Sequence, residues 1–210
     1  MANSHDTMYH ERQSLELCLL HSLNNLFQGA AFSRAYMDKL CKDLAPNAKF
    51  FNPHRSILGT GNYDVNVLMA ALAARDCCAV WFDRRKRIED VVLCKLVGII
   101  INMPSAPRIG PVTIPYVNRR HWVAIRDVAG AYFNFDSKLP EPQVIGNSED
   151  LIHYLKQLTK PADTTTDSES NSIAIFLVVP KQVEIDRSWL RNGTNYDGTT
   201  NCDADDIKST

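Results

Sequence analysis

The chain has almost no net charge and no long apolar run. Its 210 residues carry 23 Lys and Arg against 24 Asp and Glu, so we expect no overall basic surface for nucleic acid. Apolar runs such as residues 96–101 are far too short to span a bilayer, and residues 1–13 contain no apolar core of signal-peptide length. We therefore expect an intracellular, cytoplasmic protein without a transmembrane segment or a nucleic-acid partner.

The chain also lacks the cysteine spacing of a metal site. None of the six cysteines lies in a C-x-x-C arrangement, and Cys77 and Cys78 are adjacent. Zinc sites usually draw on closely spaced cysteine or histidine pairs, so no metal and no cofactor are expected. Reduced thiols suit this usage better than a disulfide framework does. The densest basic run, residues 84–87, lies between Asp83 and Glu89 and is interpreted as a solvated turn.

Apolar patterning predicts the fold class. Hydrophobic residues make up 45% of the chain, enough for one globular domain. Helical spacing predicts a helix with one buried face from Cys18 onward, a second after a Ser33 N-cap, and a third within residues 63–76. Short runs rich in β-branched residues at 79–83, 96–103 and 173–180 predict buried strands, and a further helix is expected near 149–158. The order predicts an α+β fold, with N-terminal helices on a mostly antiparallel sheet.

Three segments are too polar to predict a packed core. Residues 1–8 are expected to be a disordered N-terminus, residues 159–172 a flexible loop, and residues 192–210 a disordered polar tail. The remaining chain, residues 9–191, is the expected folded domain, with the loop at 159–172 inside it. We expect this domain to be a monomer.

Cys18 stands where a polar segment becomes a helix. A thiol at a helix N-terminus meets the positive end of the helix dipole and unpaired backbone N–H groups, which lower its pKa from about 8.5 toward neutrality. Such a thiolate is a nucleophile. Free cysteine is also among the most buried residue types, so a purely structural Cys18 is the alternative.

The stretch from His121 to Ser137 predicts a β-hairpin that turns at Ala129 and Gly130. A turn of two or four residues makes His121 and Asp136 diagonal neighbours on one face of the hairpin. Asp136 would then hold one ring N–H of His121 and leave the other nitrogen to take a proton from a thiol. A three-residue turn would send the two side chains to opposite faces. A surface pair without a catalytic role is the other alternative.

Two polar residues near Cys18 complete the candidates. Gln13 precedes it, and its amide NH₂, with a backbone N–H at the helix start, would bind the oxyanion of a tetrahedral intermediate. His21 follows Cys18 on the same helix and is a competing base. Since no carboxylate is evident to orient its ring, we expect His21 to be a partly buried polar residue.

Several long motifs resemble the Josephin family, in particular its short Josephin-only members. They are "YHERQSLELCLLHSLNNLFQ" at 9–28, "LGTGNYDVNVLMAAL" at 58–72, "RRHWVAIRDVAGAYFNFDSKL" at 119–139, and the closing "FLVVP" with "SWLR". The resemblance covers roughly residues 9–191. It implies a papain-like cysteine protease fold and cleavage of bonds at the C-terminus of ubiquitin.

Residue by residue, the resemblance assigns four roles. It implies that Cys18 is the nucleophile, His121 the base, Asp136 the third catalytic position and Gln13 the oxyanion-hole glutamine. It also implies that a helical hairpin at residues 32–72 gates access to the thiol; here Gly59 and Gly61 would be its hinges.

The sequence therefore predicts a cysteine-dependent deubiquitinase, a ubiquitin-specific thiol hydrolase of the omega-peptidase type. It would hydrolyse peptide and isopeptide bonds after the last residue of ubiquitin through an acyl-enzyme, with ubiquitin and ubiquitinated proteins as partners. An acyl transferase that uses the same triad is one alternative. A module that binds ubiquitin without cleaving it is the other.

Overall fold

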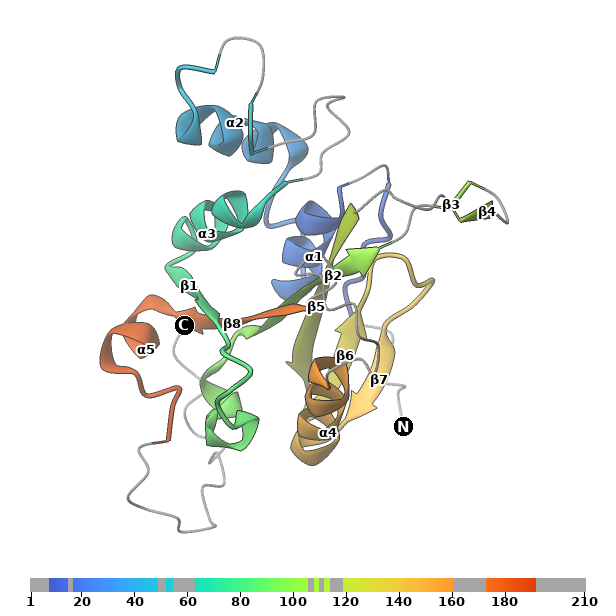
Figure 1. Ribbon diagram of the computed structural model, residues 1–210, viewed down its shortest axis with the longest axis vertical. Helices are drawn as coiled ribbons and strands as arrows, with labels where there is room; N and C mark the ends of the chain where they lie inside the picture. Colours follow the sequence, from blue (N-terminus) through green and yellow to red (C-terminus); the bar gives the residue numbers. More distant parts are fainter. Residues whose placement is uncertain are drawn as a thin grey trace.

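The computed structural model describes residues 8–14, 17–48, 52–54, 63–105, 108–109, 112–113, 119–160 and 173–191. A six-stranded sheet with the order β1-β8-β2-β5-β6-β7 runs through the molecule (Figure 1). All neighbouring strands in it are antiparallel. The strands are β1 (Cys77–Trp81), β2 (Gly98–Ser105), β5 (Arg119–Val128), β6 (Ala131–Phe135), β7 (Gln143–Gly146) and β8 (Ala174–Pro180), and a separate two-stranded ribbon joins β3 (Arg108–Ile109) to β4 (Val112–Thr113). The predicted α+β class is confirmed.

Three of the helices begin at a side chain that caps them. The Ser33 side chain accepts a hydrogen bond from the backbone of Tyr36, as predicted. Asp64 and Asn147 cap in the same way the helices that begin directly after them. The helices are α1 (Cys18–Leu26), α2 (Arg34–Leu44), α3 (Val65–Ala73), α4 (Ser148–Thr159) and α5 (Lys181–Asp186), with 3₁₀ turns at η2 (Ile88–Asp90) and η3 (Leu93–Lys95).

Helix α1 is more deeply buried than its sequence pattern predicts. All nine of its residues are buried, including the polar His21, Asn24 and Asn25. The apolar side chains pack into one core cluster with α2, α3 and one face of the sheet. The polar side chains are covered because residues 8–14 lie across them and form hydrogen bonds to them. The prediction of a single buried face was therefore wrong.

The sheet separates two cores, since alternate side chains of a strand point to opposite faces. On one face Ile100 and Ala124 pack in the cluster that contains α1. On the other face Ile101 and Ile125 pack with Leu151 of α4. Burying a leucine or isoleucine contributes about 1.5–3 kcal/mol, so each face is held by several such side chains.

The β5–β6 hairpin has a two-residue turn, which is one of the two predicted lengths. Val128 pairs with Ala131, and the two residues between them, Ala129 and Gly130, have φ values of 54° and 86°. Two positive φ angles in succession are typical of a type I′ turn, whose twist matches that of the flanking strands. This register fixes which face of the hairpin each later side chain occupies.

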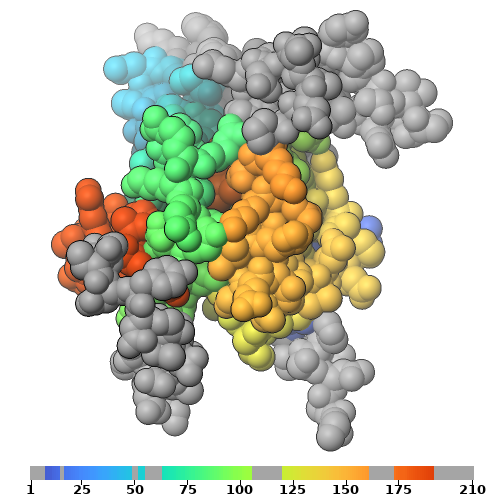
Figure 2. Space-filling view, turned by 60° about the horizontal axis from the view of Figure 1, so that its bottom comes forward, coloured from blue at the N-terminus to red at the C-terminus, as the bar shows by residue number. Residues whose placement is uncertain are grey.

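A groove lies between α4 and the segment that follows β1, and Figure 2 shows the two side by side with the hollow between them. The basic run 84–87 lines one side of this groove. Arg85 pairs there with Asp83, and both belong to an exposed turn. The interpretation of this run as a solvated turn is confirmed.

Several expectations fall on residues outside the described ranges: those for residues 1–7, 161–172 and 192–210, and for Gly59 and Gly61. Within the described part of the chain, no helix is long and apolar enough to cross a membrane, and no cluster of three or more His, Cys, Asp or Glu side chains is gathered for a metal. Cys18, Cys41, Cys77 and Cys78 are thiols outside any disulfide. Cys94 is disulfide-bonded, so the expectation of reduced thiols throughout was wrong.

Candidate active site

His121 and Asp136 meet at the open end of the β5–β6 hairpin. His121 lies on β5 and is 4% exposed, while Asp136 directly follows β6. His121 Nε2 is 2.6 Å from Asp136 Oδ1. An ionised carboxylate can only accept, so Nε2 donates and Nδ1 is the nitrogen left for another partner. The predicted contact between the side chains of His121 and Asp136 is confirmed.

The surroundings of Asp136 keep it ionised. Burial by itself would raise its pKa, but the hydrogen bond from His121 and the backbone N–H of Lys138, which donates to Oδ1 at 2.9 Å, outweigh burial. The pKa of Asp136 therefore lies below its ordinary value.

Cys18 is the first residue of α1, and it follows Leu17, which provides no side-chain cap. It is 6% exposed. Burial raises the pKa of the Cys18 thiol, although backbone hydrogen bonds from Trp122 and Leu19 and the positive charge of Lys138 oppose the rise. The expected lowering of this pKa was wrong for the structure as it stands, because burial outweighs the helix N-terminus.

Helix α1 is fastened to β5 next to His121. The hydroxyl of Ser22 donates to the backbone carbonyl of Trp122 at 2.7 Å, and both residues are buried. The backbone of Trp122 also reaches the Cys18 thiol. Since Trp122 follows His121 in the chain, these contacts set the N-terminus of α1 beside the strand that carries the imidazole.

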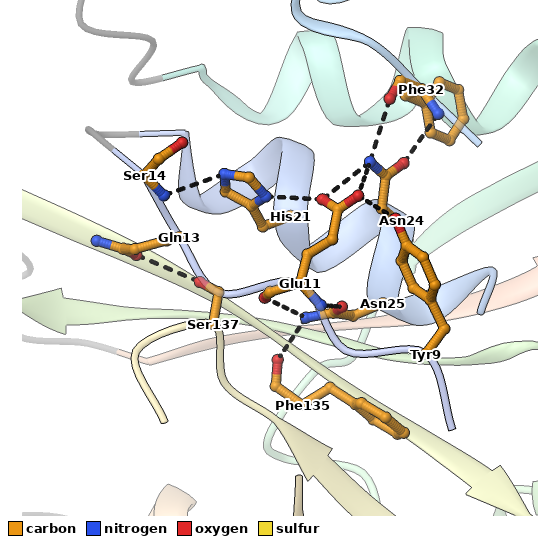
Figure 3. Close-up of polar contacts among 10 residues, drawn as sticks. All are labelled: Tyr9, Glu11, Gln13, Ser14, His21, Asn24, Asn25, Phe32, Phe135 and Ser137. Carbon is orange, nitrogen blue, oxygen red and sulfur yellow. Dashed lines mark hydrogen bonds and ion pairs between the residues drawn. The ribbon is translucent and has the colours of Figure 1, made fainter. Parts of the chain in front are cut away.

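Gln13 is attached to the loop that carries Asp136. Its backbone N–H donates to the carbonyl of Ser137 at 2.8 Å, and its side-chain Oε1 accepts from the Ser137 hydroxyl at 3.3 Å. Ser137 is 1% exposed, so the attachment point is fixed. In Figure 3 the amide nitrogen of Gln13 points away from Ser137. Gln13, Ser137 and Asp136 thus form one connected unit.

Lys138 was not predicted from the sequence as a site residue. Its Nζ donates to the hydroxyl of Ser105 at the end of β2, at 2.8 Å. From there its charge opposes the rise in the pKa of Cys18 and helps to lower the pKa of Asp136. Counting residues from the Ala129-Gly130 turn puts Lys138 across from His121, and this was the signal that would have found it.

His21 has the carboxylate that the sequence did not reveal. Its Nδ1 is 2.7 Å from Glu11 Oε2, so the expectation that no carboxylate orients this ring was wrong. Glu11 and His21 do not belong to a common helix or strand, so their contact leaves no periodic pattern in the sequence. A weaker signal existed, because His21, Asn24 and Asn25 form a polar stripe on a helix that is rich in leucine.

Helices α2 and α3 are tied to β5 through Tyr63. The indole N–H of Trp122 donates to the Tyr63 carbonyl at 3.1 Å, and the Tyr63 hydroxyl donates to Asp38 of α2 at 3.0 Å. Tyr63 is 2% exposed. The pair of helices predicted to gate the thiol is therefore anchored next to the candidate base, while the gating motion itself stays a prediction.

Comparison with known proteins identifies relatives over most of the chain. The sequence profile of the Josephin family matches residues 13–164. Josephin-2 of Homo sapiens is 45% identical over 185 residues, which cover 88% of this chain and 93% of the human protein. A Josephin-like protein of Drosophila melanogaster is 47% identical over 150 residues, or 70% of this chain and 67% of the fly protein. Ataxin-3 of Homo sapiens is 26% identical over 171 residues, or 73% of this chain and 43% of that protein.

Proposed function

The chain belongs to the Josephin family and has its α+β, papain-like fold, and from this premise we propose that it is a cysteine-dependent deubiquitinase. The observation that carries the proposal is the 2.6 Å contact between His121 Nε2 and Asp136 Oδ1, on a strand fastened beside the helix that Cys18 begins. In this proposal Cys18 is the nucleophile, His121 the acid and base, and Asp136 the group that orients His121.

The reaction begins with transfer of the Cys18 proton to Nδ1 of His121. Because burial raises the pKa of the thiol, a thiolate is favoured here only when the imidazolium forms beside it, and Asp136 stabilises that imidazolium. The sulfur then attacks the carbonyl carbon of the last glycine of ubiquitin. The side-chain amide of Gln13 and a backbone N–H at the start of α1 donate to the oxyanion.

Collapse of the tetrahedral intermediate releases the amine of the substrate, which takes its proton from His121. Ubiquitin remains joined to Cys18 as a thioester. His121 next removes a proton from water, the hydroxide attacks the thioester carbonyl, and the thiol returns. Each proton that leaves one group is received by another, so the cycle closes with these residues and water alone.

The proposal is tested with ubiquitin that carries an electrophile in place of its C-terminal carboxylate. We expect a covalent adduct that survives denaturation and is mapped by mass spectrometry to Cys18. Such an adduct requires both a nucleophilic thiol and a surface that delivers the tail of ubiquitin to it. Cys18→Ala should prevent the adduct, and Cys78→Ala, at a free thiol of intermediate exposure on β1, is the matched control.

The two alternatives give different results in the same experiment. A module that only binds ubiquitin would release the probe on denaturation. An acyl transferase would form the adduct but, with a ubiquitin thioester or amide as substrate, would pass the acyl group to an added amine in preference to water. Hydrolysis that is unaffected by the added amine supports the proposed deubiquitinase.

A further inference from the structure

Residues 8–14 lie between α1 and the loop after β6, and they are hydrogen-bonded to both (Figure 3). On one side, Gln13 N donates to the carbonyl of Ser137 at 2.8 Å. On the other side, Glu11 N donates to Asn25 Oδ1 at 2.6 Å, and Asn25 Nδ2 donates back to the Glu11 carbonyl at 3.2 Å. The segment that carries Gln13 is therefore fixed by hydrogen bonds to α1 on one side and to the loop after β6 on the other.

The Glu11 side chain turns toward α1 and gathers donors. Its Oε2 accepts from His21 Nδ1 at 2.7 Å, and Asn24 Nδ2 lies 3.0 Å from each of its two oxygens. The hydroxyl of Tyr9 also donates to it. Burial would raise the pKa of Glu11, yet these hydrogen bonds hold it below its ordinary value. Glu11 is thus an ionised carboxylate whose two oxygens both accept hydrogen bonds.

The other nitrogen of the His21 ring reaches back to the segment. The backbone N–H of Ser14 lies 3.3 Å from His21 Nε2. A backbone N–H can only donate, so Nε2 is the acceptor and the ring proton is on Nδ1, where it is donated to Glu11. Both ring nitrogens are therefore in use. This occupation leaves His21 no nitrogen with which to serve as the base for Cys18.

The geometry points to His21 as a positioning residue for Gln13. Ser14 directly follows Gln13, so the bond to His21 Nε2 fixes the backbone on one side of Gln13 while Ser137 fixes Gln13 itself. This inference rests on the proposed function, in which Gln13 donates to the oxyanion. Such donors act at about 2.7–3.1 Å, and a displacement of about 1 Å can cost about 100-fold in rate.

Two substitutions of His21 separate its two contacts. Asparagine reaches only as far as Nδ1 and keeps a donor for Glu11, but it leaves the Ser14 N–H without its acceptor. Glutamine is one methylene longer and returns an amide oxygen near the place of Nε2. We expect His21→Asn to lower kcat for a fluorogenic ubiquitin C-terminal amide by about tenfold or more, with KM little changed. We expect His21→Gln to recover most of kcat; an equal loss in both variants contradicts the inference.

Alkylation of Cys18 by iodoacetamide provides the matched control, because this displacement forms no oxyanion. Its rate should be the same in the unmodified protein and in His21→Asn. If alkylation falls together with hydrolysis, His21 acts on the thiol and the inference is overturned.

A double-mutant cycle tests whether His21 acts through Gln13. Gln13→Ala should lower kcat, and His21→Asn should cause almost no further loss in that background. Losses that multiply would show that His21 acts elsewhere and would overturn the inference. If Gln13→Ala hydrolyses the substrate normally, then the oxyanion role of Gln13 in the proposed function fails instead.

Nuclear magnetic resonance of the full chain tests the contact without any activity. Long-range ¹H–¹⁵N spectra should show a proton on Nδ1 of His21 and none on Nε2. The Ser14 amide should exchange slowly with solvent, should lose this protection in His21→Asn and should keep it in His21→Gln. A proton on Nε2, or an unprotected Ser14 amide, contradicts the inference even when hydrolysis is normal.

Discussion

Replacing Asp136 by alanine or by asparagine separates charge from orientation in the proposed triad. Two donors, His121 Nε2 at 2.6 Å and Lys138 N at 2.9 Å, converge on one oxygen of this carboxylate, Oδ1. An asparagine that places its amide oxygen there keeps both hydrogen bonds and loses only the charge. An alanine removes the acceptor, leaves two donors unpaired and frees the His121 ring to rotate.

The size of each effect follows from the bonds that are lost. A hydrogen bond to a charged group contributes about 1.5–3 kcal/mol, and each 1.4 kcal/mol is about tenfold in rate. Asp136→Ala should therefore lower kcat/KM by about 10- to 100-fold from the bond to His121 alone. A neutral acceptor retains about 0.5–1.5 kcal/mol, so Asp136→Asn should lose no more than about tenfold.

The assay is hydrolysis of a fluorogenic ubiquitin C-terminal amide, with the melting temperature measured for each variant. Glu141→Ala removes a carboxylate from an exposed position on the same loop and should leave kcat/KM unchanged. If the asparagine and alanine variants are equally inactive, charge rather than orientation is what Asp136 supplies. If the alanine variant is fully active, His121 and Asp136 do not form the catalytic pair.

Three further predictions concern the thiol, acid stability and the tail. Cys18→Ala should abolish hydrolysis and, because a buried thiol contributes about 1 kcal/mol, should shift the melting temperature by no more than about 4 °C; Cys78→Ala should retain hydrolysis. The folded-state pKa values of Asp136 and Glu11 lie below their ordinary values, so the stability they contribute is present at neutral pH and is lost as the pH falls through those lowered pKa values, below about pH 4. Thermal denaturation at several pH values should show this acid loss, and Asp136→Asn should reduce it. Removal of residues 203–210, which leaves all six cysteines in place, should change neither the melting temperature nor kcat/KM, because this segment has too few apolar residues to bury.

The hairpin could be predicted from the sequence because its determinants are local. The alternation of side chains and the Ala129-Gly130 turn fix the register, and the register fixes which residues lie near His121. The contact with Asp136 then follows from counting residues along two strands. The same counting would have indicated Lys138, whose backbone N–H bonds Asp136.

The contacts of α1 could not be predicted in this way because they depend on which other segments cover the helix. Periodicity distinguishes an apolar face from a polar one, but it does not reveal that residues 8–14 cover the polar face and make it part of the interior. The prediction that the pKa of Cys18 is lowered was wrong for the same reason. The helix N-terminus is a local feature and was visible, whereas the burial that outweighs it comes from residues distant in sequence.

The four candidate residues come from three parts of the chain, so the site depends on the contacts that join those parts. Ser22 fastens α1 to β5, which sets Cys18 beside the strand of His121. Ser137 fastens the Gln13 segment to the loop of Asp136. Each of these serines is buried, at 0% and 1% exposed. The hydroxyl of each donates a hydrogen bond to a residue that is distant in the sequence. Loss of either hydroxyl removes one hydrogen bond, worth about 1 kcal/mol of stability, and loosens the position of a candidate catalytic group, although the backbone bond between Gln13 and Ser137 stays. Activity should therefore fall further than stability when either serine is replaced by alanine, since catalysis requires donors and nucleophile to hold their geometry more closely than folding does.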